Sequence, residues 1–173
     1  VDLRSRAAPG AVEWLINELT QRSFPLPLAE PLHHEDVVKT ARFSPDGKKI
    51  VTTSNDKTAK IWETATGSLL ADLKGHNSDV ISGQFSPDGK KIVTASWDST
   101  AIVWDVASAT IVWILKGHSK VVYYAEFSPD GKKIITVSGD KTAKIWDVST
   151  GEILFDLSGE DGHTRELTYA QFS

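Results

Sequence analysis

The sequence lacks several features that mark particular classes of protein. Its 173 residues include no cysteine, so disulfide bonds and thiolate chemistry are excluded. No apolar run reaches the roughly 18 residues that a membrane-spanning helix needs. Neither GxxxxGK[ST] nor GxGxxG is present, so the sequence gives no sign of a phosphate-binding loop. We therefore expect no cofactor.

The sequence also lacks a large excess of charge of either sign. Its 19 Lys and Arg and 23 Asp and Glu give a net charge of −4. This balance creates no general attraction to nucleic acid or to an anionic membrane, so we expect neither as a partner. The N-terminus has no charged segment followed by an apolar core, as a secretory signal would, and we expect a cytoplasmic protein. Because the chain begins with Val1 and contains no methionine, we also expect it to be a piece of a longer protein.

What the sequence does contain is one stretch repeated three times. FSPDGKK begins at Phe43, at Phe85 and at Phe127, so the copies are 42 residues apart, and the similarity continues for about twenty residues after each start. A fixed period of this size indicates a repeat architecture. Each unit has too little apolar surface to form a core alone and needs its neighbours stacked against it.

Each unit divides into four short strands separated by turns. In the first unit we predict strands at Val38–Phe43, Lys49–Ser54, Thr58–Trp62 and Ser68–Leu73. Ser-Pro-Asp-Gly between the first two is a typical tight turn. Four hairpin-linked strands make one antiparallel blade. We place the blades at about 32–74, 75–116 and 117–158, with part of a fourth at 159–173, including a first strand at Leu167–Phe172.

The segment before the repeats, residues 1–31, has a different pattern. Val12, Leu15, Ile16 and Leu19 recur at helical spacing, which predicts a short amphipathic helix over Ala11–Gln21. Its polar face is acidic, which argues against a membrane-surface helix and favours one that docks on whatever precedes or covers the repeats. The next stretch, Phe24 to Pro31, contains three prolines, which indicates a linker or at most an edge strand.

Paired motifs frame the units. Gly-His precedes two of them and the partial fourth, at Gly75-His76, Gly117-His118 and Gly162-His163. Trp-Asp or Trp-Glu closes each unit, at Trp62-Glu63, Trp104-Asp105 and Trp146-Asp147. With these motifs at this period, the stretch from Leu32 to Ser173 resembles the WD-repeat β-propeller family. The first unit departs from the pattern, because His33 stands where the other units have glycine.

The resemblance implies an all-β fold, a partial β-propeller of three four-stranded antiparallel blades. Propellers close with about four to eight blades, so three cannot form a ring. Either the natural chain is longer or copies self-associate through open blade edges. The outermost strand of the second blade, TIVWIL from Thr110 to Leu115, is apolar enough to need cover.

The resemblance also implies a structural hydrogen-bonded tetrad of His, Asp, Ser or Thr, and Trp in each blade. A buried indole N–H needs an acceptor, and a buried imidazole needs partners for both nitrogens. The predicted members are His34, Ser54 and Asp56 with Trp62, then His76, Ser96 and Asp98 with Trp104, then His118, Ser138 and Asp140 with Trp146. Thr52, Thr94 and Thr136 are equal alternatives to the three serines, because each lies two residues away on the same face.

Positions that differ between the copies are the candidates for partner binding, since the shared ones maintain the fold. In the family such positions tend to face one end of the propeller. Asn55 and Trp97 each directly precede the aspartate of the turn after the second strand. Lys39, Ile81, Val121 and Tyr123 lie at the start of the first strand of their units. An apolar and aromatic patch with polar surroundings is typical of a binding hot spot. The alternative is that these side chains pack against neighbouring loops.

The remaining polar residues do not indicate chemistry. The histidines recur on different blades, too far apart for a metal site, and the lone pair His33-His34 is a weak candidate. The Asp-His-Ser pattern resembles a hydrolase triad but repeats three times beside a tryptophan, which favours a structural network. We therefore predict no enzyme activity, no metal, and a protein–protein interaction scaffold. The alternative is a regulatory or sensor arm of a larger enzyme.

Overall fold

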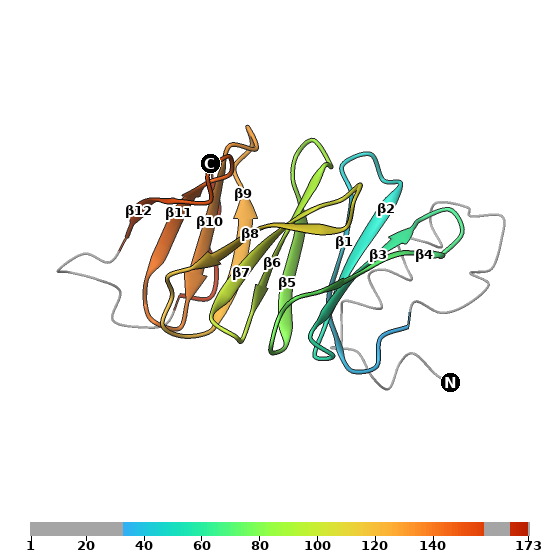
Figure 1. Cartoon of the computed structure of the whole chain (residues 1–173), viewed down its shortest axis with the longest axis horizontal. Coiled ribbons are helices and arrows are strands. Elements are labelled where there is room, and N and C mark those ends of the chain that lie inside the picture. Colours follow the sequence, from blue (N-terminus) through green and yellow to red (C-terminus); the bar gives the residue numbers. More distant parts are fainter. Residues whose placement is uncertain (1–32, 158–166, 173) are drawn as a thin grey trace.

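The computed structural model describes residues 33–157 and 167–172, and every regular element in these ranges is a β-strand. Twelve strands form three separate antiparallel sheets, which we call blades 1, 2 and 3 (Figure 1). Blade 1 consists of β1 (Val38–Phe43), β2 (Lys49–Ser54), β3 (Thr58–Glu63) and β4 (Leu69–Lys74). Blade 2 consists of β5 (Val80–Phe85), β6 (Lys91–Ser96), β7 (Thr100–Asp105) and β8 (Thr110–Lys116). Blade 3 consists of β9 (Val122–Phe127), β10 (Lys133–Ser138), β11 (Ala143–Asp147) and β12 (Ile153–Asp156).

The repeated turn sequence explains the hairpins. In blade 1 the amide of Gly47 donates to the carbonyl of Ser44 at 2.8 Å, and Gly47 has φ +70°, which glycine adopts without strain. The Ser44 hydroxyl donates to Asp46, and the same carboxylate accepts from the Lys48 amide. The corresponding bonds recur in blades 2 and 3. Each copy of Ser-Pro-Asp-Gly therefore closes its own hairpin by local interactions.

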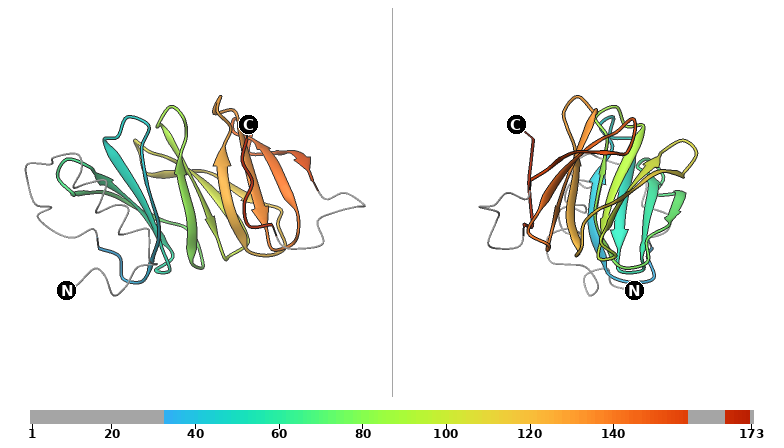
Figure 2. Two further views of the ribbon diagram at one scale, coloured as in Figure 1. Left: turned by 180° about the vertical axis from the view of Figure 1, so that it is seen from behind. Right: turned by 60° about the vertical axis from the view of Figure 1, so that its left-hand side comes forward.

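The three blades stand side by side in a row (Figures 1 and 2). The first strands β1, β5 and β9 contact one another in sequence, so the inner edges of the blades lie together, and strand order within each sheet runs outward to β4, β8 and β12. The all-β partial propeller of three four-stranded blades predicted from the repeats is confirmed.

The core consists of two apolar layers between blades. Between blades 1 and 2, Val51, Ile61 and Leu73 face Phe85 and Trp104. Between blades 2 and 3, side chains at the equivalent positions and the next tryptophan form the second layer: Val93, Val103, Leu115, Phe127 and Trp146. A third, smaller cluster of Ala41, Ile50 and Trp62 lies within blade 1. The two larger layers join neighbouring blades, as expected for stacked repeats.

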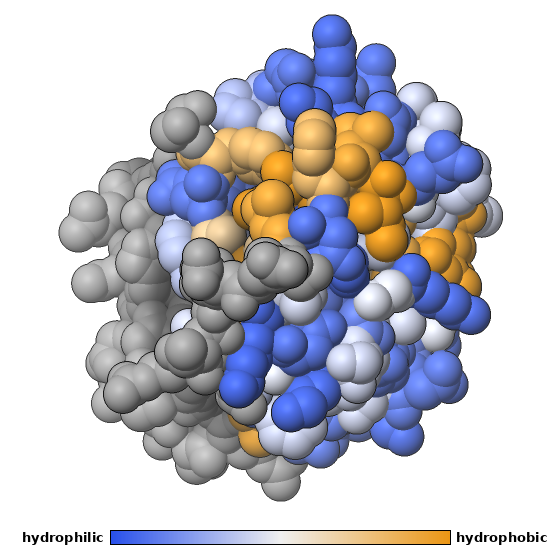
Figure 3. Space-filling view, turned by 90° about the vertical axis from the view of Figure 1, so that its left-hand side faces the viewer, coloured by the Kyte–Doolittle hydropathy of each residue, from blue (hydrophilic) through white to orange (hydrophobic). Residues whose placement is uncertain are grey.

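The outward face of blade 3 is covered only in part. Leu73 and Leu115, at equivalent positions of blades 1 and 2, are each 1% exposed, whereas Leu157 is 44% exposed and Phe155 is 55% exposed. Ile135 and Val137, on the inner part of the same blade, are buried. Figure 3 views this end of the stack and shows apolar atoms gathered on it.

The helix over Ala11–Gln21 and the rest of 1–31 lie outside the described residues. The predicted strand at Leu167–Phe172 is wrong, because residues 167–172 have no regular secondary structure. In the three blades the first strand pairs with the second strand of its own sheet, and residues 167–172 have no such partner among the described strands. They do lie beside blade 3, where the Leu167 amide donates to the Ser138 carbonyl at 3.3 Å.

Candidate functional site

Two connections meet at one end of every blade: the loop that enters the first strand, and the turn between the second and third strands. A backbone bond joins them in each blade, donated by the amides of Asn55, Trp97 and Gly139 to the carbonyls of Val37, Asp79 and Val121, at 3.0 Å in all three cases. The variable position after the second strand therefore lies next to the variable position before the first strand.

A β-bulge brings a further variable residue to this end. The pairing between the first and second strands shifts by one residue at Lys39 in blade 1, Ile81 in blade 2 and Tyr123 in blade 3. A bulge leaves one residue unpaired and redirects its side chain. These positions were predicted from their variability between the copies, but nothing in the sequence indicates the bulge.

We call the nine variable positions at this end of the three blades the end surface: Val37, Lys39, Asn55, Asp79, Ile81, Trp97, Val121, Tyr123 and Gly139. It includes all six residues predicted to bind a partner. Trp97 is 55% exposed, whereas Ile81, Val121, Tyr123, Lys39 and Asn55 are half-buried. Because β5 and β9 contact each other, Ile81 and Tyr123 lie on neighbouring strands. The half-buried residues pack partly within the fold, and Trp97 is the side chain that extends furthest into solvent.

Two lysines at the same end of blade 3 were missed by the sequence analysis. Lys120 precedes Val121, Lys141 follows Asp140, and both are exposed. Their equivalents are Asp36 and Lys57 in blade 1, and Ser78 and Ser99 in blade 2. Comparison of these positions between the copies would have found them.

Beneath the end surface each blade contains a buried chain of four side chains. In blade 1 the Nδ1 atom of His34 lies 2.7 Å from the Asp56 carboxylate, and its Nε2 lies 2.7 Å from the Thr52 hydroxyl. The Trp62 indole donates to the same hydroxyl at 2.8 Å. The chain recurs as Asp98–His76–Thr94–Trp104 in blade 2 and as Asp140–His118–Thr136–Trp146 in blade 3.

The hydroxyl in each chain belongs to threonine, so Ser54, Ser96 and Ser138 are not the residues that join histidine to tryptophan. Trp62 lies directly opposite Ile50 in the sheet, which makes Thr52 its diagonal neighbour and leaves Ser54 one step further along the strand. Ser54 has another role: it donates to the Asp36 carbonyl and accepts from the Asp56 amide, each at 3.1 Å.

The donors and acceptors fix the direction of the chain. The indole N–H of Trp62 can only donate, so the Thr52 oxygen accepts from it, and the Asp56 carboxylate can only accept, so Nδ1–H of His34 donates to it. In the neutral imidazole Nε2 is then unprotonated and accepts from the Thr52 hydroxyl. Burial, acting against the charged ring, lowers the pKa of His34 and of His118, which agrees with neutral imidazoles.

The aspartates in the chains are held as carboxylates. Burial favours the neutral acid, but hydrogen bonds donated by His76, Thr100 and the Asn77 amide outweigh it and hold the pKa of Asp98 well below its ordinary value. The pKa of Asp140 is lowered in the same way. Each aspartate thus connects the entering loop to the turn and stiffens the end of its blade.

The buried chains are not arranged for catalysis. Each threonine hydroxyl is already bonded to histidine and tryptophan and is at most 2% exposed, so a substrate has no access to it. Among residues 33–157 and 167–172, no three His, Cys, Asp or Glu side chains are grouped to hold a metal ion. None of these residues forms a helix long and apolar enough to cross a membrane.

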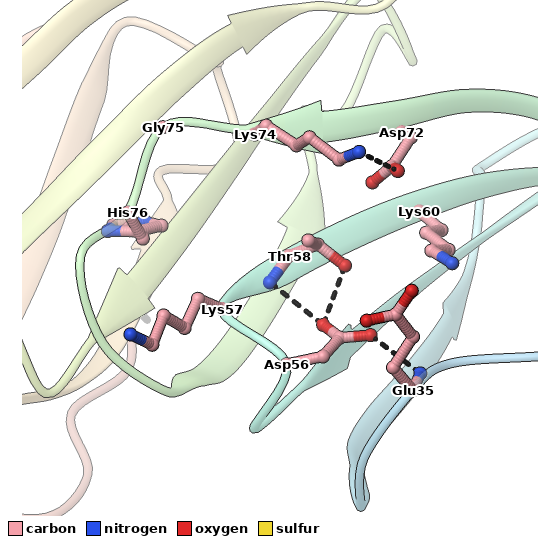
Figure 4. A pocket seen from close by; sticks show the side chains of 9 residues that line it. All are labelled: Glu35, Asp56, Lys57, Thr58, Lys60, Asp72, Lys74, Gly75 and His76. Carbon is pink, nitrogen blue, oxygen red and sulfur yellow. Dashed lines mark hydrogen bonds and ion pairs between the residues drawn. The ribbon is translucent and has the colours of Figure 1, made fainter.

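A charged pocket of about 240 Å³ lies between blade 1 and the loop that enters blade 2 (Figure 4). Its lining consists of Glu35, Asp56, Lys57, Thr58, Lys60, Asp72, Lys74, Gly75 and His76. Lys74 pairs with Asp72 at 3.0 Å, and Asp56 accepts from Thr58. Because lysines and carboxylates are equal in number and partly neutralise one another, the pocket offers no excess charge to a ligand.

Comparison with known proteins shows the family. The sequence matches the family described as WD domain, G-beta repeat, at residues 27–63, 67–105 and 109–147, which together make up more than half of the chain. The chain therefore belongs to the WD-repeat family, whose repeats generally mediate protein–protein interaction. The match at 67–105 spans β4 and then β5 to β7, so one repeat includes the outer strand of blade 1 and three strands of blade 2.

Several curated proteins resemble part of the chain. WD repeat-containing protein 86 of Homo sapiens is 42% identical over 45 residues, which are 26% of this chain and 12% of that protein. Nuclear distribution protein PAC1 of Komagataella phaffii is 39% identical over 46 residues, 26% of this chain and 9% of that protein. Apoptotic protease-activating factor 1 of Rattus norvegicus is 49% identical over 45 residues, 26% of this chain and 4% of that protein. The chain thus spans a small part of the length of these relatives.

Proposed function

We propose that this chain is a non-catalytic scaffold that binds a protein partner through the end surface. The observation that carries the proposal is the exposure of Trp97, which is 55% exposed, whereas Trp62, Trp104 and Trp146 are each at most 5% exposed. The three buried indoles maintain the blades, and Trp97 makes no comparable contribution to the core. An exposed tryptophan among half-buried apolar and polar neighbours is what the centre of a protein-binding site requires.

The rigidity beneath the end surface supports this role. Asp98 accepts from the Asn77 amide and from Thr100, so the loop before β5 and the turn that carries Trp97 are tied to one group. The Trp97 amide is bonded to the Asp79 carbonyl in addition. A site whose backbone is already ordered loses less conformational entropy on binding, which favours affinity.

The proposal is tested by Trp97→Ala, with Leu70→Ala as the matched control. Leu70 is 49% exposed but lies on β4, the outer strand of blade 1, away from the end surface. Proteins captured from an extract of the source cells would be quantified for the parent and both variants. We expect Trp97→Ala to reduce the main captured protein at least about tenfold, as hot-spot tryptophans do, and Leu70→Ala to leave it unchanged.

The amount of captured protein is measured in the same way for Tyr123→Ala, because Tyr123 is half-buried in blade 3. Thermal unfolding of all variants separates binding from folding. If Trp97→Ala melts far below the parent, the indole is structural, and the proposal is wrong. Equal loss of capture in Trp97→Ala and Leu70→Ala would also contradict a site at the end surface.

A further inference from the structure

The end surface differs in charge from blade to blade, and this difference indicates what kind of partner it takes. Resting on the function proposed above, we infer that its partner is an acidic peptide segment with an apolar side chain. Its carboxylates would lie on Lys120 and Lys141, and its apolar side chain would lie against Trp97.

Both lysines are fixed to one residue through their backbones. The Lys120 carbonyl accepts from the Ser138 hydroxyl at 3.1 Å, and the Lys141 amide donates to the Ser138 carbonyl at 3.1 Å. Lys141 has φ +72° in a turn that Asp140 holds by accepting from the Thr142 amide and hydroxyl. The two ammonium groups therefore extend from an ordered corner of blade 3.

The corner carries positive charge that the described residues do not neutralise. Neither Lys120 nor Lys141 forms an ion pair with a described carboxylate. The nearest acidic group along the chain, Asp140, is already engaged by His118 and by the Ser119 amide. Two exposed lysines that pair with no carboxylate of the described residues attract an anionic group.

The equivalent corners of the other blades are different. Blade 1 has Asp36 and Lys57, whose charges cancel, and blade 2 has two serines. A net charge of two positive units at this pair of positions therefore occurs in blade 3 alone among the three blades, although the whole chain carries −4. Such a local difference sets the direction in which a charged peptide lies across the blades.

The apolar part of the site lies on the adjoining blade. Trp97 in blade 2 and Gly139 in blade 3 occupy equivalent positions, and Gly139 is buried and adds no side chain next to the lysines. Ile81 and Tyr123 stand on the neighbouring strands β5 and β9. A peptide with an apolar residue beside acidic residues matches this arrangement, in which the apolar Trp97 lies on blade 2 and the two lysines lie on blade 3.

Three synthetic peptides of one length test the inference: an acidic one built as Asp-Glu-Leu-Phe-Glu-Asp, its neutral amide analogue Asn-Gln-Leu-Phe-Gln-Asn, and the basic Lys-Arg-Leu-Phe-Arg-Lys. Their dissociation constants for the 173-residue chain would be measured by titration calorimetry at low and high salt. We expect the acidic peptide to bind roughly fivefold to tenfold more tightly than the neutral one at low salt, as two exposed ion pairs allow. Salt should reduce that difference.

Matched variants assign the effect to the residues. The double substitution Lys120→Glu and Lys141→Glu should reverse the preference toward the basic peptide, whereas Lys48→Glu and Lys90→Glu, at exposed lysines of the β1–β2 and β5–β6 turns, should not. Trp97→Ala should weaken the acidic and neutral peptides by the same factor. Unchanged thermal unfolding of both charge variants shows that the fold is intact.

The outcomes separate this inference from the proposed function. If the neutral or basic peptide binds as tightly as the acidic one, or if none binds, the acidic-peptide inference is wrong, while partner capture that depends on Trp97 would still support the end surface. A single-stranded oligonucleotide that binds more tightly than the acidic peptide, and loses binding in the double lysine variant, would replace the peptide by nucleic acid. Loss of Trp97 dependence in the capture experiment overturns the proposed function itself.

Discussion

The interface between blades 1 and 2 and the interface between blades 2 and 3 solve the same packing problem with different side chains. In the first, Ala71 on β4 and Ala109 in the β7–β8 turn both pack against the apolar layer. In the second, Trp113 occupies the position equivalent to Ala71, and Gly151 occupies the position equivalent to Ala109. A Cβ atom on Gly151 would lie 2.7 Å from the Trp113 ring, so the large residue is accommodated because its neighbour has no side chain.

Trp113 also makes a bond that the first interface has no equivalent for: its indole donates to the Val148 carbonyl at 3.0 Å. The hydrogen-bonded chains, by contrast, are nearly identical in the two interfaces. The repeat therefore keeps the polar partners the same and varies side-chain volume in compensating pairs. Neighbouring blades are therefore matched to each other and are not interchangeable.

The largest expected loss of stability is at the hydrogen-bonded chains that the two interfaces share. Thr94→Val in the first interface and Thr136→Val in the second each remove the hydroxyl that accepts from a buried indole and donates to a buried imidazole. Leaving two buried polar groups unpaired should lower the free energy of unfolding by about 2–4 kcal/mol in either variant. Chemical denaturation of both variants measures it.

Thr94→Ser is the control, because it keeps the hydroxyl and removes one methyl group. It should cost about 1 kcal/mol. If the free energies of unfolding of the two valine variants differ by more than about 2 kcal/mol, the two interfaces do not share an equivalent polar chain.

A somewhat smaller effect is expected at the residue that distinguishes the second interface. Trp113→Ala removes a half-buried aromatic ring and its bond to Val148, and should cost about 2–3 kcal/mol. Ala71→Trp should also destabilise, since Ala109 has the Cβ atom that Gly151 lacks. Adding Ala109→Gly to Ala71→Trp should recover part of that loss, and failure of this rescue would mean that the turn residue does not determine which side chain fits.

Gly151→Ala is expected to cost about 2 kcal/mol, from a left-handed backbone at φ +72° and from overlap with the Trp113 ring. In the Trp113→Ala background the overlap disappears, and only the backbone strain of about 1 kcal/mol should remain. A double-mutant cycle by denaturation therefore gives a coupling energy near 1 kcal/mol. Strict additivity would show that the two residues do not interact.

Much of the fold could be read from the sequence because the repeat supplies three independent copies of each signal. The predicted strands of the first unit agree with β1 to β4 to within one residue at each boundary, and the turns followed from Pro-Asp-Gly. The choice between threonine and serine could not be made from spacing, which gives the face of a strand but not the partner opposite. Knowing that Ile50 pairs with Trp62 would have decided it.

The candidate site was predicted less completely. Variability between copies found Trp97 and the bulge residues Lys39, Ile81 and Tyr123, but an alternating pattern does not reveal where a strand gains a residue. The pairing of Trp113 with Gly151 depends on how one blade is placed against the next, which no property of a single repeat determines. Lys120 and Lys141 gain their importance only once both are known to be bonded to Ser138.

The smallest expected effect is a dependence on pH that distinguishes the buried chains by their histidines. Burial lowers the pKa of His118 in the second interface and of His34 in blade 1, so below about pH 6.5 the unfolded chain binds protons that the folded chain does not. Stability is therefore fully present above the unfolded pKa and is lost as the pH falls toward the folded pKa. The lowered pKa values of Asp98 and Asp140 act in the same direction, but below about pH 4.

The melting temperature of the parent should decline as the pH is lowered from 8 to 5, and the decline should begin at about pH 6.5. His118→Gln removes one of the titrating groups, so its slope over this range should be shallower even though its absolute stability is lower. The readout is the slope, because loss of a buried bond alone lowers stability equally at every pH. A parent curve that is flat down to pH 5, or a variant slope equal to that of the parent, would mean that the imidazole of His118 is not kept neutral by the chain from Trp146 to Asp140.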